Sequence, residues 1–177
     1  MLTQQQVQAP HSSYLIAGLK KSKSNSFRNR HNIGFRILGT VCLSYYKPGF
    51  LKLYSKHTNT IYLKPQTYMN RSEVSLDCSS IFFRIPNSNI LLIYDDINLD
   101  FGSVDVRFNG GSAGHNRLKN IESAFFRIRV EIKDTLNKYP IKNFALSNFS
   151  ILEEKQLPMI YKYTKCVIDA FSKNLIL

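Results

Sequence analysis

The sequence predicts a single α/β domain in which helices flank a mixed, mostly parallel sheet. Three observations favour this fold class. Short apolar runs with strand character alternate along the chain with segments whose apolar residues recur at helical spacing. Residues 90–94 are continuously apolar, which is typical of a strand buried on both faces. A chain of 177 residues is long enough for one domain with a substantial core and too short for two comfortable ones.

The predicted domain covers residues 14–177 and follows a flexible polar tail at residues 1–13. The tail lacks the basic and apolar segments of a secretory signal, and no apolar run approaches the roughly 20 residues that cross a bilayer. The cysteines Cys42, Cys78 and Cys166 are odd in number and lack CxxC spacing, which favours buried or half-buried thiols in a reducing compartment over disulfides or a zinc site. We therefore expect a soluble, cytoplasmic protein.

The first half of the chain predicts three strands and two helices. Residues 14–19 form a short apolar run that stops at a glycine, and a polar loop follows. Residues 32–46 carry apolar side chains at helical spacing, with Asn32 as a candidate N-cap. The remaining elements are a weakly alternating strand, a strand that a proline stops, and a helix, at residues 49–54, 60–65 and 69–83.

The second half predicts three more strands and two more helices. A buried strand at residues 89–94 ends abruptly at Asp95 and Asp96. A strand then runs from the turn at Phe101 and Gly102 to residue 108, where a glycine-rich loop begins. The last elements are a short helix, an alternating half-buried strand and a basic helix, at residues 117–126, 126–132 and about 153–175.

The charge balance points to a polyanionic partner. The chain has 24 Lys and Arg residues against 12 Asp and Glu residues, a formal net charge of +12. A surface of this kind attracts polyanions, so nucleic acid is the favoured partner. A generally basic surface without a specific partner is the alternative, and charge alone does not separate the two.

Polar residues that end apolar strands mark the ligand crevice of an open α/β sheet. His31 lies between a basic loop and an apolar helix, where it could titrate near neutral pH, although a lone histidine at a helix start is more often a cap or surface residue. Asp95 follows a buried strand, where its charge needs a partner such as an imidazole N–H, and a turn or cap aspartate is an equal alternative. A third place of this kind is the segment 114–116, Gly-His-Asn.

The loop at residues 109–116, NGGSAGHN, could bring backbone amides close to a phosphate or to another backbone, because glycine allows close approach and positive φ. It is neither a Walker A sequence nor GxGxxG, so a nucleotide-binding domain is set aside.

Four segments, in this order, resemble the bacterial-type peptidyl-tRNA hydrolase family: GL…RHNIGF, LKPQTYMN, LLIYDDINLDFG and GGSAGHNRLKNI. The likeness extends over about residues 14–150. It implies an α/β fold, hydrolysis of the ester that joins a peptide to the 3′ ribose of tRNA, and recycling of tRNA during translation. The partner it implies is tRNA, which suits the positive charge. We expect no metal and no cofactor, because a positioned base and amide donors suffice to hydrolyse an activated ester. We also expect the protein to be a monomer.

The resemblance also assigns roles by position. His31 corresponds to the catalytic base that takes a proton from the attacking water, and Asp95 to the partner that orients it. The implied substrate-binding residues are Lys21, Tyr68, Met69, Asn70, His115 and Asn116. Arg107 falls where the family has a basic residue for tRNA phosphates, and the weaker candidates from local charge alone are Lys119, Lys138 and Lys142.

The chain departs from the family pattern around the cleft and the tRNA-binding surface. Lys21 replaces an asparagine, Glu73 and Arg117 stand where glycines are usual, and Asp105 stands where a second basic tRNA contact is often found. These changes favour an alternative function, a catalytically weak or inactive relative that binds RNA as a splicing or ribosome-associated factor. The retained set His31, Asp95, Asn70 and Asn116 favours the enzyme.

Overall fold

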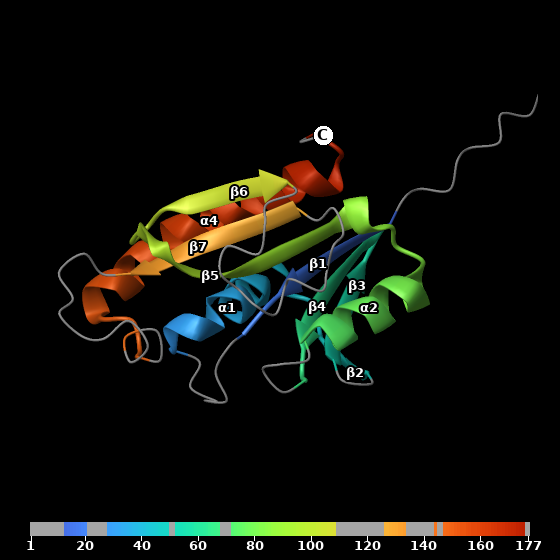
Figure 1. The fold of residues 1–177 in the computed structure, drawn as a ribbon, viewed down its shortest axis with the longest axis horizontal. Coiled ribbons are helices and arrows are strands. Elements are labelled where there is room, and N and C mark those ends of the chain that lie inside the picture. The colour runs from blue at the N-terminus through green and yellow to red at the C-terminus, as the bar shows by residue number, and fades with distance from the viewer. Residues whose placement is uncertain are drawn as a thin grey trace, which may run out of the picture.

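The computed structural model describes residues 13–20, 28–49, 52–67, 72–108, 126–133, 144 and 147–175. Its centre is a seven-stranded sheet in the order β2-β3-β4-β1-β5-β7-β6 (Figure 1). Neighbouring strands are parallel in the middle of the sheet, from β4 through β1 and β5 to β7, and antiparallel towards both edges. The predicted α/β class with a mixed sheet is therefore confirmed.

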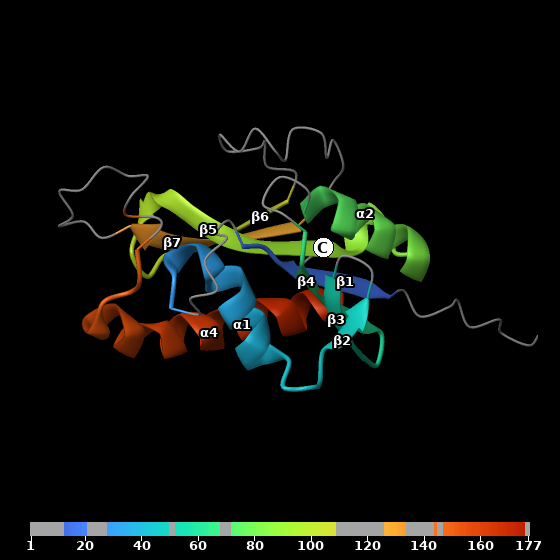
Figure 2. The same ribbon diagram turned by 90° about the horizontal axis from the view of Figure 1, so that it is seen from below.

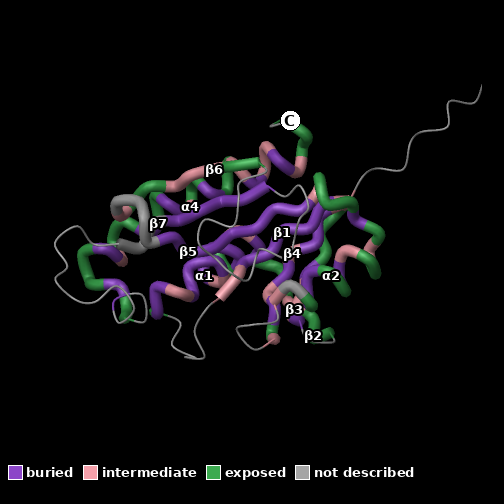
Figure 3. Tube along the Cα trace, viewed as in Figure 1, coloured by how far each residue is buried: buried purple, intermediate pink, exposed green. Residues whose placement is uncertain are grey.

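The parallel strands contribute many of the buried residues whose burial the structure describes, because helices cover both faces of the sheet. They are β1 (Tyr14–Gly18), β4 (Thr60–Pro65), β5 (Ile90–Asp100) and β7 (Phe126–Lys133). All five residues of β1 are buried, and Figure 3 shows the central strands mostly in the purple of buried residues. The antiparallel strands are β2 (Lys47–Gly49), β3 (Lys52–His57) and β6 (Val104–Phe108).

Helices α1 (Ile33–Val41) and α4 (Ile151–Ser172) lie on one face of the sheet, and α2 (Ser72–Phe83) lies on the other (Figure 2). Two single 3-10 turns, Arg30–Asn32 and Asn87–Asn89, precede α1 and β5. The core has two parts accordingly. One apolar cluster joins α1 and α4 to one face of the strands, and the other joins α2 to the opposite face.

The first helix is shorter than its sequence predicts, because it ends at Val41 instead of continuing to Tyr46. Leu43 and Tyr45 are exposed, so the residues beyond Cys42 offer α1 no buried face to continue. The carbonyl oxygen of Leu38 accepts a hydrogen bond of 3.0 Å from the backbone N–H of Cys42 and a second one, of 3.1 Å, from the Tyr46 hydroxyl.

The start of this helix also differs from the expectation. The side chain of Asn32 makes no capping hydrogen bond to α1. The capping side chain belongs to Asn29, whose Oδ1 accepts a hydrogen bond of 3.0 Å from the backbone N–H of His31. The 3-10 turn placed ahead of α1 moves the cap three residues towards the N-terminus.

The buried strand does not end at Asp95 and Asp96, as predicted, but continues to Asp100 as β5. Both aspartates lie inside the strand and are almost completely buried. They are tolerated there because His31 pairs with Asp95 and Arg129 pairs with Asp96.

Some expectations are corrected in smaller ways or lie outside the described residues. Cys42 is buried, whereas Cys78 and Cys166 are exposed. The weakly alternating segment contributes to two antiparallel strands, β2 and β3, in place of one. The tail up to residue 12, the loop at residues 109–116 and the helix predicted at residues 117–126, as far as residue 125, lie outside the described residues.

Candidate active site

The start of α1 lies directly against the sheet because two glycines remove side chains from the contact. A Cβ atom on Gly34 would lie 2.5 Å from the backbone oxygen of Ile93 and 2.6 Å from that of Leu19. A Cβ atom on Gly18 would lie 2.4 Å from the backbone oxygen of Gly34. Only glycine allows backbone to approach backbone this closely. The turn that precedes α1 is thereby held beside β5.

This packing brings His31 to Asp95. The Nδ1 atom of His31 lies 2.6 Å from Oδ2 of Asp95, although the two residues are 64 positions apart in sequence. An ionised carboxylate can only accept hydrogen bonds, so Nδ1 carries the proton and donates it. In the neutral imidazole, the other ring nitrogen, Nε2, then has no proton and can act as a base.

Burial differs sharply between the two partners. The Asp95 side chain is fully buried, whereas 14% of the His31 side chain is exposed. A buried carboxylate is costly without hydrogen-bond donors, and the imidazole supplies one. The pair therefore has a fixed, buried orienting group and a partly exposed titratable group, which is the arrangement expected of a general base.

A second set of charges lies on the opposite face of the sheet, because successive strand residues alternate between faces. Asp96 accepts a hydrogen bond of 2.8 Å from Arg129, which also donates to Asp105. Burial raises the pKa of the Asp105 carboxyl, but the hydrogen bonds from Arg129 and Arg107 outweigh it and hold that pKa below its ordinary value. Asp105 is therefore ionised at neutral pH.

Arg107 lies on the edge strand β6, away from His31. Its Nε atom donates a hydrogen bond of 2.7 Å to Asp105, and 58% of its side chain is exposed. Asp105, which stands where the family often has a basic residue, thus lies directly beside Arg107. Asp105 is shared by two guanidinium groups, and Asp96 also pairs with Arg129, so the two aspartates balance the charges of the two arginines.

The other predicted site residues lie outside the described residues: Lys21, Tyr68, Met69, Asn70, His115, Asn116, Lys119, Lys138 and Lys142. The structure thus brings together His31 and Asp95 and places Arg107 at the sheet edge. Sequence reasoning missed Asn29, which holds the backbone of His31, and the pairing of Asp96 with Arg129. The alternation of FRIRV could have indicated the second, since it places the two arginines of β7 on one face.

Within the described ranges, no helix is both long and apolar enough to cross a membrane. Over the same residues, no group of three or more His, Cys, Asp or Glu side chains is arranged to hold a metal ion.

Comparison with known proteins shows a likeness over nearly the whole chain. The family model described as peptidyl-tRNA hydrolase matches residues 15–176. The peptidyl-tRNA hydrolase of Aliarcobacter butzleri is 34% identical over 166 residues, which cover 89% of this chain and 91% of that protein. The peptidyl-tRNA hydrolase of Rickettsia bellii is 34% identical over 173 residues, which cover 90% of each chain.

The fold has solved counterparts. The crystal structure of peptidyl-tRNA hydrolase from Acinetobacter baumannii superimposes with a TM-score of 0.80 and covers 95% of this chain and 93% of that one. Sequence identity in this match is 23%, so it bears on the fold alone. The arrangement of strands and helices described above is therefore one that known proteins adopt.

Proposed function

Because this chain belongs to the peptidyl-tRNA hydrolase family, we propose that it is a carboxylic ester hydrolase that cleaves the ester between peptide and tRNA in peptidyl-tRNA. The observation that carries the proposal is the hydrogen bond of 2.6 Å between His31 and Asp95. It supplies a base with one nitrogen oriented and the other available, which ester hydrolysis by water requires. The products of the proposed hydrolysis are a free peptide and a tRNA that can be used again in translation.

The proposed reaction begins with proton transfer from water to Nε2 of His31. The water oxygen attacks the ester carbonyl carbon as it loses the proton, and negative charge develops on the carbonyl oxygen. Asp95 stabilises the imidazolium that forms, because its carboxylate faces the protonated Nδ1. The bond between the carbonyl carbon and the ribose 3′ oxygen then breaks, and the proton on Nε2 passes to that oxygen.

The remaining parts of the site are proposed by family position. Asn70 and Asn116 would donate amide hydrogen bonds to the developing oxyanion or the peptide, and Lys21, Tyr68, Met69 and His115 would line the cleft. The reaction needs no metal or cofactor, since the ester is an activated acyl group and the base is already oriented. We further propose that the enzyme acts as a cytoplasmic monomer.

Contacts to the tRNA are proposed for Arg107, with Lys119, Lys138 and Lys142 as further candidates. A net charge of +12 and the 58% exposure of the Arg107 side chain support a phosphate-binding role at the sheet edge. Such contacts position the nucleic acid without reading its sequence.

The test is the release of N-acyl amino acid from N-acyl-aminoacyl-tRNA by the purified protein. The wild type should turn over, His31→Ala should nearly abolish release, and Asp95→Asn should weaken it. His57→Ala and Asp77→Asn are matched controls, because both residues are exposed and lie on β3 and α2. A wild type that binds tRNA but releases nothing above background would instead support an RNA-binding protein without catalytic activity.

A further inference from the structure

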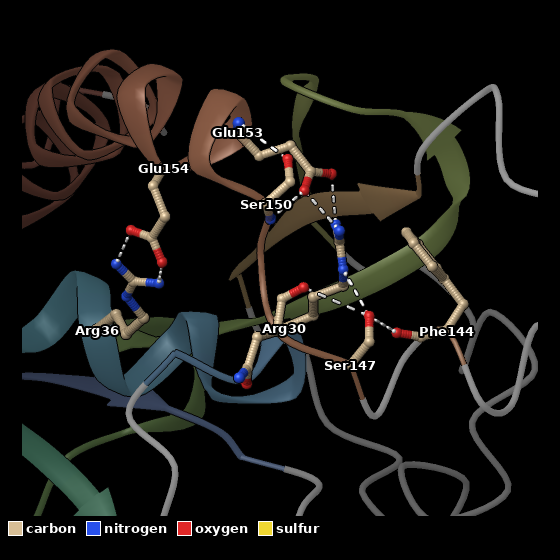
Figure 4. A network of polar contacts seen from close by, with 8 residues as sticks. Arg30, Arg36, Phe144, Ser147, Ser150, Glu153 and Glu154 are labelled. Atoms are coloured by element: carbon tan, nitrogen blue, oxygen red, sulfur yellow. Dashed lines mark hydrogen bonds and ion pairs between the residues drawn. The ribbon is translucent and has the colours of Figure 1, made fainter.

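The turn that carries His31 is fastened to the start of α4 by a buried ion pair. Both terminal nitrogens of Arg30 donate to Glu153, at 2.6 Å and 2.5 Å, across 123 positions of sequence (Figure 4). The side chains are 4% and 9% exposed. A two-pronged contact of this kind restrains both the position and the orientation of the guanidinium.

The same turn has further attachments to the segment that leads into α4. The backbone N–H of Arg30 donates a hydrogen bond of 3.0 Å to the carbonyl oxygen of Ser147, and its Nε donates one of 3.1 Å to the Ser147 hydroxyl. The rings of Phe144 and Phe149 lie against the guanidinium, with centroids 4.1 Å and 4.9 Å from its carbon. The backbone and the side chain of Arg30 are thus both held by hydrogen bonds, and two aromatic rings pack against its guanidinium group.

Glu153 is itself fixed by the helix that it begins. It accepts a hydrogen bond of 2.7 Å from the backbone N–H of Ser150, and its own N–H donates one of 3.3 Å to the Ser150 hydroxyl. Within this capping box, the Ser150 backbone N–H orients the carboxylate, whereas the Ser150 hydroxyl bonds only the Glu153 backbone N–H. Burial raises the pKa of Glu153, but the hydrogen bonds from Arg30 and Ser150 outweigh it and lower that pKa below its ordinary value.

We propose that Arg30 and Glu153 are positioning residues for His31, whose ion pair holds the imidazole in line with Asp95. The inference rests on the proposed function. Arg30 immediately precedes His31 in a 3-10 turn of three residues. A single turn has few hydrogen bonds of its own, so its geometry depends on outside contacts. Misplacement of a catalytic group by about 1 Å can lower the rate about a hundredfold.

A second ion pair nearby provides an internal comparison. Arg36 donates two hydrogen bonds, at 2.8 Å and 2.7 Å, to Glu154, the residue next to Glu153 (Figure 4). This pair joins α1 to α4, because Arg36 lies inside α1, five positions beyond His31, whereas Arg30 lies in the turn ahead of α1. The two hydrogen bonds between Arg36 and Glu154 tie α1 to α4 and do not involve the turn that carries His31. Loss of the two pairs should therefore have different effects on catalysis.

The experiment measures kcat and KM for N-acyl-aminoacyl-tRNA in four variants. Arg30→Lys and Glu153→Gln break the two-pronged contact, Glu154→Gln weakens the second pair, and Ser150→Ala removes the cap hydroxyl. We expect the first two to lower kcat at least about tenfold with KM within about twofold, since a positioning defect acts on the chemical step. Glu154→Gln and Ser150→Ala should lower the melting temperature and leave kcat within about twofold.

A spectroscopic measurement separates this inference from the proposed function. In the wild type, NMR should show a downfield, slowly exchanging Nδ1 proton of His31, donated to Asp95. The signal should weaken or exchange faster in Arg30→Lys and Glu153→Gln and persist in the two controls. If the wild type does not hydrolyse the substrate, the proposed function fails while this signal still tests positioning. Unchanged kcat and signal, or equal losses of kcat in Glu154→Gln, would overturn the positioning role.

Discussion

His31 and Asp95 form a hydrogen bond of 2.6 Å between the turn ahead of α1 and the middle of β5. The contact exists because Gly18 and Gly34 let the start of the helix lie directly on the strands. The carboxylate is fully buried and the imidazole is partly exposed. Each partner thus has the environment that its proposed role needs.

Replacement of Asp95 by Asn should lower kcat by roughly 10²–10⁴-fold. The amide keeps the size of the side chain but loses the negative charge that stabilises the imidazolium, and it can stabilise the wrong imidazole tautomer. The measurement is single-turnover release of N-acyl amino acid at saturating enzyme. Rates within twofold of the wild type would show that His31 does not depend on this carboxylate.

Replacement of Gly34 by Ala should destabilise the fold by about 1–3 kcal/mol, the usual cost of overpacking. The added Cβ would meet backbone oxygens at 2.5 Å and 2.6 Å, which cannot move aside as a flexible side chain can. Gly39→Ala is the matched control in the same helix, because its Cβ would meet only the Lys64 ammonium, at 3.4 Å. Urea unfolding should show a loss for the first variant and no loss for the second; equal results would contradict the close-approach argument.

Replacement of Arg107 by Gln should weaken binding of tRNAs of different sequence to the same extent. It should also reduce the slope of log affinity against log salt by about 1, as expected for one lost phosphate contact. The exposed Arg107 side chain lies on the edge strand, where a duplex could reach it. Binding is measured by fluorescence anisotropy over a salt series. Lys56→Gln, an exposed site on β3, serves as the control and should leave the slope unchanged.

Replacement of Asp105 by Asn should have the opposite effect on binding. The carboxylate lies 2.7 Å from Arg107 and also accepts from Arg129, so it lowers the positive potential at the edge. The amide keeps an oxygen acceptor but removes the charge, and tRNA affinity at low salt should rise about threefold or more. The same anisotropy series measures it, and a weaker complex would argue that Asp105 orients Arg107 for the phosphate.

The stability contributed by Glu153 should depend on pH. Its pKa in the folded protein lies below the ordinary value of 4.5, so its ionised form stabilises the fold. That contribution is complete above about pH 5 and is lost as the pH falls below 4.5 towards the folded-state pKa. Glu153→Gln should therefore be less stable than the wild type by roughly 1–3 kcal/mol at pH 7, and the difference should shrink in acid. Urea titrations at a series of pH values measure this, and a constant difference would contradict it.

Local sequence patterns predicted the class of the fold and the approximate places of many helices and strands, although the ends of α1 and β5 differ in the structure. The apolar run at residues 90–94 predicts a buried strand, and the helical spacing at about residues 153–175 predicts the last helix, which the structure has at Ile151–Ser172. The resemblance to a family selected His31 and Asp95 from several polar strand ends. The distance between the side chains of His31 and Asp95, and the burial of each, could not be deduced without the packing of α1 against the sheet.

Only the tertiary structure decided where charged residues could remain buried. The sequence pattern ended the strand at Asp95, yet β5 continues to Asp100 because His31 and Arg129 supply partners from distant segments. Likewise, nothing local to RHN indicates that Arg30 pairs with Glu153, 123 residues away. The free energy of a buried charge depends on its partners, and those partners become neighbours only when the chain has folded.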